Sequence, residues 1–84
     1  MQVYEAGVVS HVIAGMKSHT KSSAVQQHSC TALANLAEHE ECKAKIVSED
    51  GIQLVLQAMK EHTSSSGLAE AACVALASLS SAEG

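Results

Sequence analysis

The sequence predicts an all-α fold, with about five helices arranged as two tandem copies of one repeat unit. A pattern of residues recurs at a separation of about 43 positions, and repeats of this length are typical of helical solenoids. Within each copy, apolar residues return at spacings of three and four, which is the periodicity of one helix face. No segment shows the strict apolar and polar alternation of a half-buried strand, so no sheet is expected.

The repeat includes polar loop residues as well as apolar ones, which amphipathic helices alone would not produce. Two pairs of segments correspond at a separation of 43, namely Met16–Ser23 with Met59–Ser66 and Cys30–Leu36 with Cys73–Leu79. Upstream, Glu5–Val8 corresponds to Glu49–Ile52 at a separation of 44. The first copy therefore has one extra residue, which we place at Gly15.

The second copy is expected to contain three helices, the first ending near Gly51, because glycine often closes a helix in the left-handed conformation. The loop before the third helix is expected around residues 63–66. The expected apolar faces are Cys42, Ile46 and Val47 on the first helix, Ile52, Val55, Leu56 and Met59 on the second, and Leu68, Ala72, Ala75, Leu76 and Leu79 on the third. The third face has its counterpart in the first copy at Val25, Ser29, Ala32, Leu33 and Leu36.

Two local signals concern the loops between the last two helices of each copy. Ser23 followed by Gln26 has the form of a capping box, which predicts a helix start near residue 24. The recurring pairs His19-Thr20 and His62-Thr63 are interpreted as turn residues, with each threonine helping to start the next helix.

Charge and composition exclude several classes of partner. The net charge is −4, and the five Lys and Arg residues form no basic run, so we expect neither nucleic acid nor a membrane surface as a partner. No apolar stretch approaches the roughly 18 residues of a spanning helix, and the N-terminus does not have the form of a signal peptide. Three irregularly spaced cysteines indicate reduced thiols. These features predict a cytoplasmic or nuclear protein.

Catalytic and metal chemistry find little support in the residues. His28 with Cys30 and His39 with Cys42 offer zinc-type ligands, but their spacings do not match paired-ligand motifs, and His28 becomes Ala71 in the second copy. No glycine-rich phosphate loop or nucleophile motif occurs. We therefore expect no enzyme activity, no metal and no cofactor. We expect Cys30 and Cys73 to be buried packing residues, although an oxidative cross-link between them is conceivable on adjacent helices.

A short, a medium and a long helix in about 43 residues, with Gly between the first two, resemble the armadillo repeat. The signature Ala-Leu-x-Asn-Leu-Ala of its third helix is complete in residues 32–37, and residues 75–80 keep its apolar frame with Ser78 in place of Asn. HEAT repeats are the neighbouring alternative, but they have two helices per unit and usually a proline. The fuller pattern is also similar to the armadillo-like arrays at the N-terminus of large leucine-rich-repeat kinases.

The resemblance implies a right-handed α-α superhelix in which the third helices line a concave surface. Residues 1–84 would form a single segment, with the last two helices of one repeat in 1–38 and one complete repeat in 39–84. The predicted partner-binding residues on this surface are Gln27, Thr31 and Asn35 with their counterparts Glu70, Val74 and Ser78. By resemblance, Asn35 would hydrogen-bond the backbone of an extended peptide, since an amide both donates and accepts. The alternative is that its amide caps or bridges neighbouring helices.

Two functions follow from this reading. The first is a protein interaction scaffold that binds an extended peptide or a partner helix on the concave surface. Thr31 and Val74 occupy the positions where import receptors of the family have Trp, so binding of nuclear localisation signals is not expected. The second is a structural spacer in a regulatory armadillo-like array of a larger signalling protein, such as a leucine-rich-repeat kinase. In either case the open end faces allow for a homo-oligomer.

Overall fold

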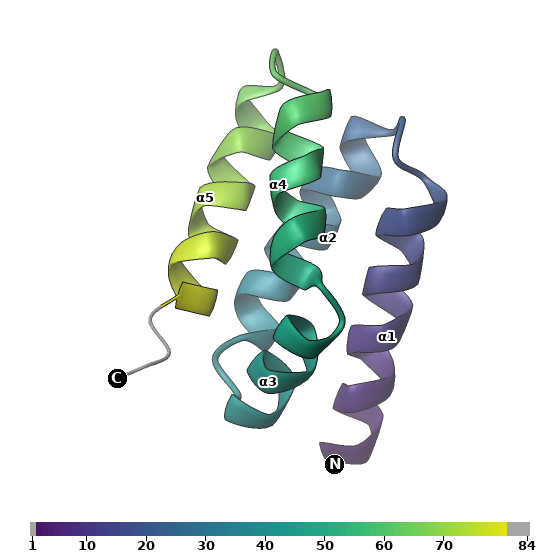
Figure 1. Cartoon of the computed structure of the whole chain (residues 1–84), viewed down its shortest axis with the longest axis vertical. Helices are drawn as coiled ribbons and strands as arrows, with labels where there is room; N and C mark the ends of the chain where they lie inside the picture. The colour runs from purple at the N-terminus through teal and green to yellow at the C-terminus, as the bar shows by residue number, and fades with distance from the viewer. Residues whose placement is uncertain (1, 81–84) are drawn as a thin grey trace.

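The computed structural model describes the backbone of residues 2–80 and the side chains of residues 7–80, and it consists of helices joined by short loops (Figure 1). The helices are α1 (Gln2–Ser18), α2 (Ser23–Leu36), α3 (Glu40–Ser48), α4 (Gly51–Glu61) and α5 (Ser66–Ser80). No strand occurs between residues 2 and 80. The prediction of an all-α fold with about five helices is confirmed.

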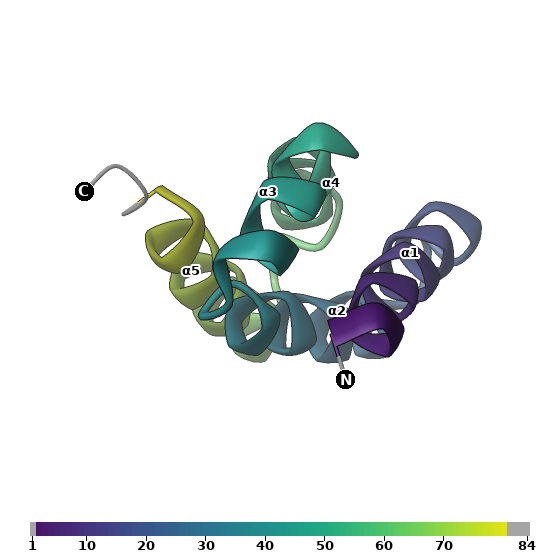
Figure 2. The ribbon, with the colours of Figure 1, turned by 90° about the horizontal axis from the view of Figure 1, so that it is seen from below.

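The helices form two units that lie side by side. In the first unit α1 packs on α2, and in the second α4 packs on α5 while the short helix α3 contacts α1 and α4. The most extensive contact between any two of these helices joins α2 to α5, and so holds the units together. Seen end on, α2 lies between α5 on one side and α1 on the other, and α3 and α4 lie above them (Figure 2).

One hydrophobic core runs through both units. It is built almost entirely from aliphatic residues, alanines and cysteines, because the chain has no Phe or Trp. Small side chains such as Cys30, Ala34 and Ala72 let neighbouring helices approach closely, and each of them is buried. The core is therefore continuous across the α2–α5 contact, as expected for stacked repeats.

The predicted apolar faces agree only in part with the observed burial. In the second unit Cys42, Ile46 and Val55 are buried as expected, but Val47 and Leu56 are 48% and 41% exposed. On α5, Leu76 is half-buried and the other four predicted positions are buried, namely Leu68, Ala72, Ala75 and Leu79. On α2 only Leu33 of the predicted stripe is fully buried, and four positions are half-buried, namely Val25, Ser29, Ala32 and Leu36.

The exposure of the α2 stripe has a simple cause. The second unit covers a different face of α2, whose buried residues are Gln26, Cys30, Leu33 and Ala34. The predicted face of α2 is the counterpart of the apolar face of α5. In the structure this face of α2 is turned away from the second unit. The same difference in neighbours explains why Cys73 is exposed although its counterpart Cys30 is buried. Cys30 is on the face of α2 that the second unit covers, and no described helix covers the equivalent face of α5. The prediction of two buried thiols is therefore wrong for Cys73.

The corner between α3 and α4 differs from the expectation at Gly51. The residue with the left-handed backbone is Asp50, with φ of 66°, which Asp adopts more readily than most non-glycine residues. Gly51 is instead the buried first residue of α4. A Cβ atom there would lie 2.9 Å from the carbonyl oxygen of Ile46, so the glycine is needed for close approach and not for a positive φ.

The start of α2 also differs from the predicted capping box. Ser22, and not Ser23, is the N-cap, and its hydroxyl accepts from the Val25 N–H at 3.2 Å. Ser65 takes the equivalent place before α5, where its hydroxyl accepts from the Leu68 N–H at 3.3 Å. The caps are therefore serines related by 43 positions, and the expected roles of Ser23 and of the two threonines are not observed.

Gln26 serves the end of α1 and not the start of its own helix. Its side chain is buried, and its Nε2 group donates to the carbonyl oxygens of Met16 at 3.2 Å and His19 at 2.9 Å. These carbonyls belong to the last turn of α1 and the residues after it, where helical partners run out. Gln26 therefore ties α1 to α2 within the first unit.

His62 connects the equivalent loops of the two units. Its Nε2 atom lies 2.8 Å from the carbonyl oxygen of Thr20, in the loop between α1 and α2. His19, its counterpart 43 positions earlier, is exposed. The recurring His-Thr pair is thus part of the contact between units, beyond its expected role in the turns.

The unbroken helix α1 helps to locate the extra residue of the first copy. The helix continues without a break from Gln2 to Ser18, through both Gly7 and Gly15. In this unbroken helix the separation of 43 extends back to Val9, which pairs with Ile52, and Ile13 pairs with Leu56. The change in register therefore lies close to Val8, upstream of the predicted place at Gly15.

Replacing Gln26 with Ala should lower the free energy of unfolding by about 1–3 kcal/mol, because the carbonyl oxygen of Met16 would lose the Nε2 donor and that of His19 would keep only the Ser22 N–H. The matched control is Gln53→Ala on the exposed surface of α4, which should change stability by no more than about 0.5 kcal/mol. Urea unfolding followed by circular dichroism measures both. Equal effects of the two substitutions would show that Gln26 does not join α1 to α2.

Candidate partner-binding groove

A groove of about 340 Å³ runs between α2 and α5. Its lining residues come from α2 and from the first half of α5, and they are Gln27, Thr31, Ala34, Asn35, Gly67, Glu70, Ala71 and Val74. Five of the six residues predicted for partner binding are among them. The sixth, Ser78, lies farther along α5 and is half-buried.

The groove is a direct result of helix periodicity and of the α2–α5 contact. Gln27, Thr31 and Asn35 recur every four residues, so they lie along one face of α2. Glu70 and Val74 have the same spacing on α5. Because the two helices pack side by side through their buried faces, these two rows form the facing walls. Ala34 and Ala71 lie at the sides where the helices approach each other.

Gly67 leaves space in the groove for the side chain of Gln27. A Cβ atom at Gly67 would lie 2.9 Å from both the Nε2 and the Oε1 atoms of Gln27. The amide of Gln27 therefore lies over the first turn of α5, and Gln27 is half-buried. Sequence reasoning did not identify Gly67, because its counterpart in the first copy is Ala24 and nothing in the pattern marks it.

Asn35 is exposed, and its side chain makes no hydrogen bond with any described residue. Its amide is thus free to donate and accept at the wall of the groove, which does not support the alternative that it caps or bridges helices. Thr31 is different, because its hydroxyl donates to the carbonyl oxygen of Gln27 at 3.1 Å. Of the polar groups on this face of α2, Asn35 is the one most available to a ligand.

The α5 wall combines a carboxylate with an apolar side chain. Glu70 is exposed and has no ion-pair partner among residues 7–80. Val74 is 54% exposed, the largest exposed fraction among the large hydrophobic residues that the structure describes. The lining residues include no Lys, Arg or His. The groove is therefore mildly acidic, with an apolar patch at Val74.

The residues considered for catalysis and metal binding lie apart from this groove. Burial raises the pKa of the Cys30 thiol to about 11, so this group stays protonated at neutral pH and is a poor nucleophile. Within the part of the chain that the structure describes, no three His, Cys, Asp or Glu side chains come together as a metal site. None of the three cysteines forms a disulfide. The described helices include none with the length and apolar character needed to cross a bilayer.

Comparison with known families identifies the repeat. A sequence model of the family described as LRRK2 ARM repeat matches residues 4–83. The chain belongs to this family. Comparisons with curated proteins and with solved structures gave no match. The match covers both units, so the predicted resemblance to the armadillo repeat is confirmed, and the LRRK2 ARM repeat family is a non-catalytic repeat fold.

The two packed glycines of this armadillo segment should respond differently to Ala. Gly51→Ala should destabilise the fold by about 1–3 kcal/mol, because its Cβ would press on the backbone of Ile46. Gly67→Ala should leave stability unchanged or raise it by up to about 1 kcal/mol, because the flexible Gln27 side chain can move away and Ala favours the helix. Thermal unfolding compares the two variants.

The same pair of variants tests the position of Gln27. In Gly67→Ala the side-chain NH₂ resonances of Gln27 should shift in an NMR spectrum, whereas Gly51→Ala should leave them in place. If Gly67→Ala destabilised the fold as much as Gly51→Ala, the amide of Gln27 would be fixed in the groove and not displaceable.

Proposed function

We propose that this armadillo segment is a protein interaction scaffold and that the groove between α2 and α5 binds an extended peptide. The carrying observation is that the exposed amide of Asn35 has no hydrogen-bond partner among the described residues and lies in the same groove as Gln27, Glu70 and Val74. An amide group matches the donor and acceptor of a peptide unit whatever its sequence. The family match supports the coarser statement that the chain is a repeat scaffold.

The groove also suggests the kind of peptide. Glu70 provides the only charge among the lining residues, so a neutral or basic ligand side chain at that point is favoured over an acidic one. Val74 offers an exposed aliphatic surface to an apolar side chain of the peptide. In an extended peptide this side chain would be next to, or two residues away from, the one that faces Glu70. Thr31 and Val74 provide no aromatic walls, so the peptide is not expected to be held by stacking on the stem of a Lys or Arg.

The alternative function is a structural spacer in a regulatory armadillo-like array of a larger signalling protein. The continuous core through the α2–α5 contact supports it, since stacking of units is the main contact in the structure. As a spacer the chain would still display the groove, but no ligand would occupy it. For either function we propose a single repeat segment without enzyme activity, in the cytoplasm or nucleus.

The test is Asn35→Ala in peptide binding. Peptides selected from a random display library against the whole chain would be labelled and titrated by fluorescence anisotropy. Loss of the Asn35 amide should weaken binding by about five- to thirtyfold, as one or two hydrogen bonds at about 1 kcal/mol each imply. The unfolding free energy should stay the same or rise slightly, because Ala favours a helix more than Asn.

Two controls make the result specific. Gln53→Ala removes an exposed amide from α4, outside the groove, and should leave peptide affinity unchanged. Val74→Asp removes the apolar patch of the groove and should weaken binding of peptides that place an apolar side chain there. Equal affinity in wild type and Asn35→Ala would eliminate the role of Asn35. If Val74→Asp also had no effect, or if the library gave no binder, the spacer function would be favoured.

A further inference from the structure

The two units provide a template for a contact that the described residues leave unmade. Several residues of the first unit that face the second unit are fully buried, and their counterparts 43 positions later are exposed. Ile13 is 2% exposed whereas Leu56 is 41% exposed. Cys30 and Ala34 are buried, but Cys73 and Ala77 are exposed. The second unit therefore repeats the docking surface of the first unit with nothing packed on it among the described residues.

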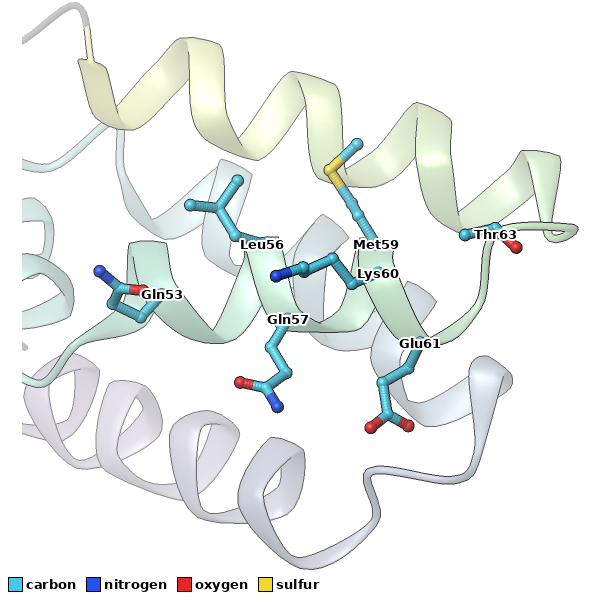
Figure 3. A pocket seen from close by; sticks show the side chains of 7 residues that line it. All are labelled: Gln53, Leu56, Gln57, Met59, Lys60, Glu61 and Thr63. Carbon is cyan, nitrogen blue, oxygen red and sulfur yellow. The ribbon is translucent and has the colours of Figure 1, made fainter.

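We call this surface the trailing face and define it by Leu56 and Met59 on α4 and by Cys73 and Ala77 on α5. Beside α4 it includes a hollow of about 960 Å³ that is lined by Leu56 and Met59 together with Lys60. Figure 3 shows Leu56 and Met59 on the side of α4 toward α5, whereas Gln57 and Glu61 point the other way, toward α1. In the first unit the counterparts of Leu56 and Met59 are Ile13 and Met16, and both are buried.

The opposite end of the molecule carries the matching surface. In the second unit, four residues of α5 are completely or almost completely buried, namely Leu68, Ala72, Ala75 and Leu79. Their counterparts on α2 are only half-buried, and with Val12 of α1 they form what we call the leading face, namely Val12, Val25, Ser29, Ala32 and Leu36. The side chains are of similar size in each pair, with Ser29 in place of Ala72 as the one polar change.

We propose that copies of this chain associate head to tail, with the leading face of one copy seated on the trailing face of the next. The occupant is a second copy because its leading face has the same pattern of residues as the surface that already docks on the first unit. None of the nine residues that define the two faces is charged, so the contact between these side chains is apolar. Lys60 and Glu61 also line the hollow, and their charged groups would have to keep their contact with water. The contact would repeat the α2–α5 packing between molecules.

Three consequences distinguish this association from a symmetric dimer. The two faces are different, so the contact is heterologous and leads to an open chain of copies. Association should depend on concentration, because the contact joins separate molecules. Each junction would also place α5 of one copy beside α2 of the next and so create a further groove of the kind already described.

The proposal is independent of peptide binding. Ser29 and Ala77 do not line the groove between α2 and α5, so substitutions there should leave peptide affinity unchanged. Failure of the association and failure of the groove would therefore appear in different variants.

The experiment is sedimentation of the whole chain over a wide range of concentrations. Wild type should show an average mass that rises with concentration beyond that of a dimer. Ala77→Glu on the trailing face and Ser29→Glu on the leading face should each remain monomeric, with circular dichroism confirming that both are folded. An equimolar mixture of the two variants should form a heterodimer and nothing larger, because one intact leading face and one intact trailing face remain.

Chemical modification gives a second route that needs no substitution. Cys73 is exposed while Cys30 and Cys42 are buried, so a bulky maleimide on the native chain should label Cys73 and abolish association. A wild type that stays monomeric at every concentration would overturn the proposal. So would association that neither variant reduces, or a closed dimer that Ala77→Glu abolishes and Ser29→Glu leaves intact, since that pattern means trailing face on trailing face.

Discussion

The structure depends on the packing of α5 against α2. The other helix contacts are less extensive, and α1, α3 and α4 occupy positions that this contact sets. The residues that make it possible are small or aliphatic: Cys30, Leu33 and Ala34 on α2, and Ala72 and Ala75 on α5, all buried. Without Phe or Trp, the core gains its apolar burial from many small side chains at close range. Loss of this one contact would leave two helix groups that are each too small for a stable core.

The candidate groove follows from the same contact. Helices that pack closely along their buried faces bring the adjacent faces into two facing rows, so the residues beside the contact become the walls of a groove. The contact thus decides which residues a partner can reach, and Asn35 and Val74 are exposed there while Ala34 beside them is buried. In this chain the same two helices therefore provide, through neighbouring faces, both the main buried contact and the walls of the candidate groove.

The sequence predicted the helices, the repeat and five of the six residues on the groove, because all three depend on periodicity along the chain. It did not predict which residues close the helix ends. Ser22 and Ser23 are both competent caps. In the structure the Ser22 hydroxyl accepts from the Val25 N–H, and the Gln26 side chain is directed toward the carbonyls of Met16 and His19 and does not close a capping box. At the α3–α4 corner Asp50 has the left-handed backbone, and Gly51 is needed for close approach to Ile46.

The exposure of Cys73 could not be predicted from its resemblance to Cys30, because two residues with the same local sequence have different neighbours. Cys30 faces the second unit, and the same face of α5 has no helix on it among residues 2–80. Internal repeats predict the local structure of each copy well. They predict burial only where both copies are flanked in the same way.

The most direct test of the account is amide hydrogen exchange of the whole chain at increasing denaturant concentration. If the α2–α5 contact holds both units together, the most protected amides of α2 and α5 should exchange through one common opening, with the same free energy and the same denaturant dependence. If the amides of α5 exchanged at a much lower free energy while those of α2 kept their protection, the two units would unfold independently. That result would contradict the claim that the α2–α5 contact holds them together.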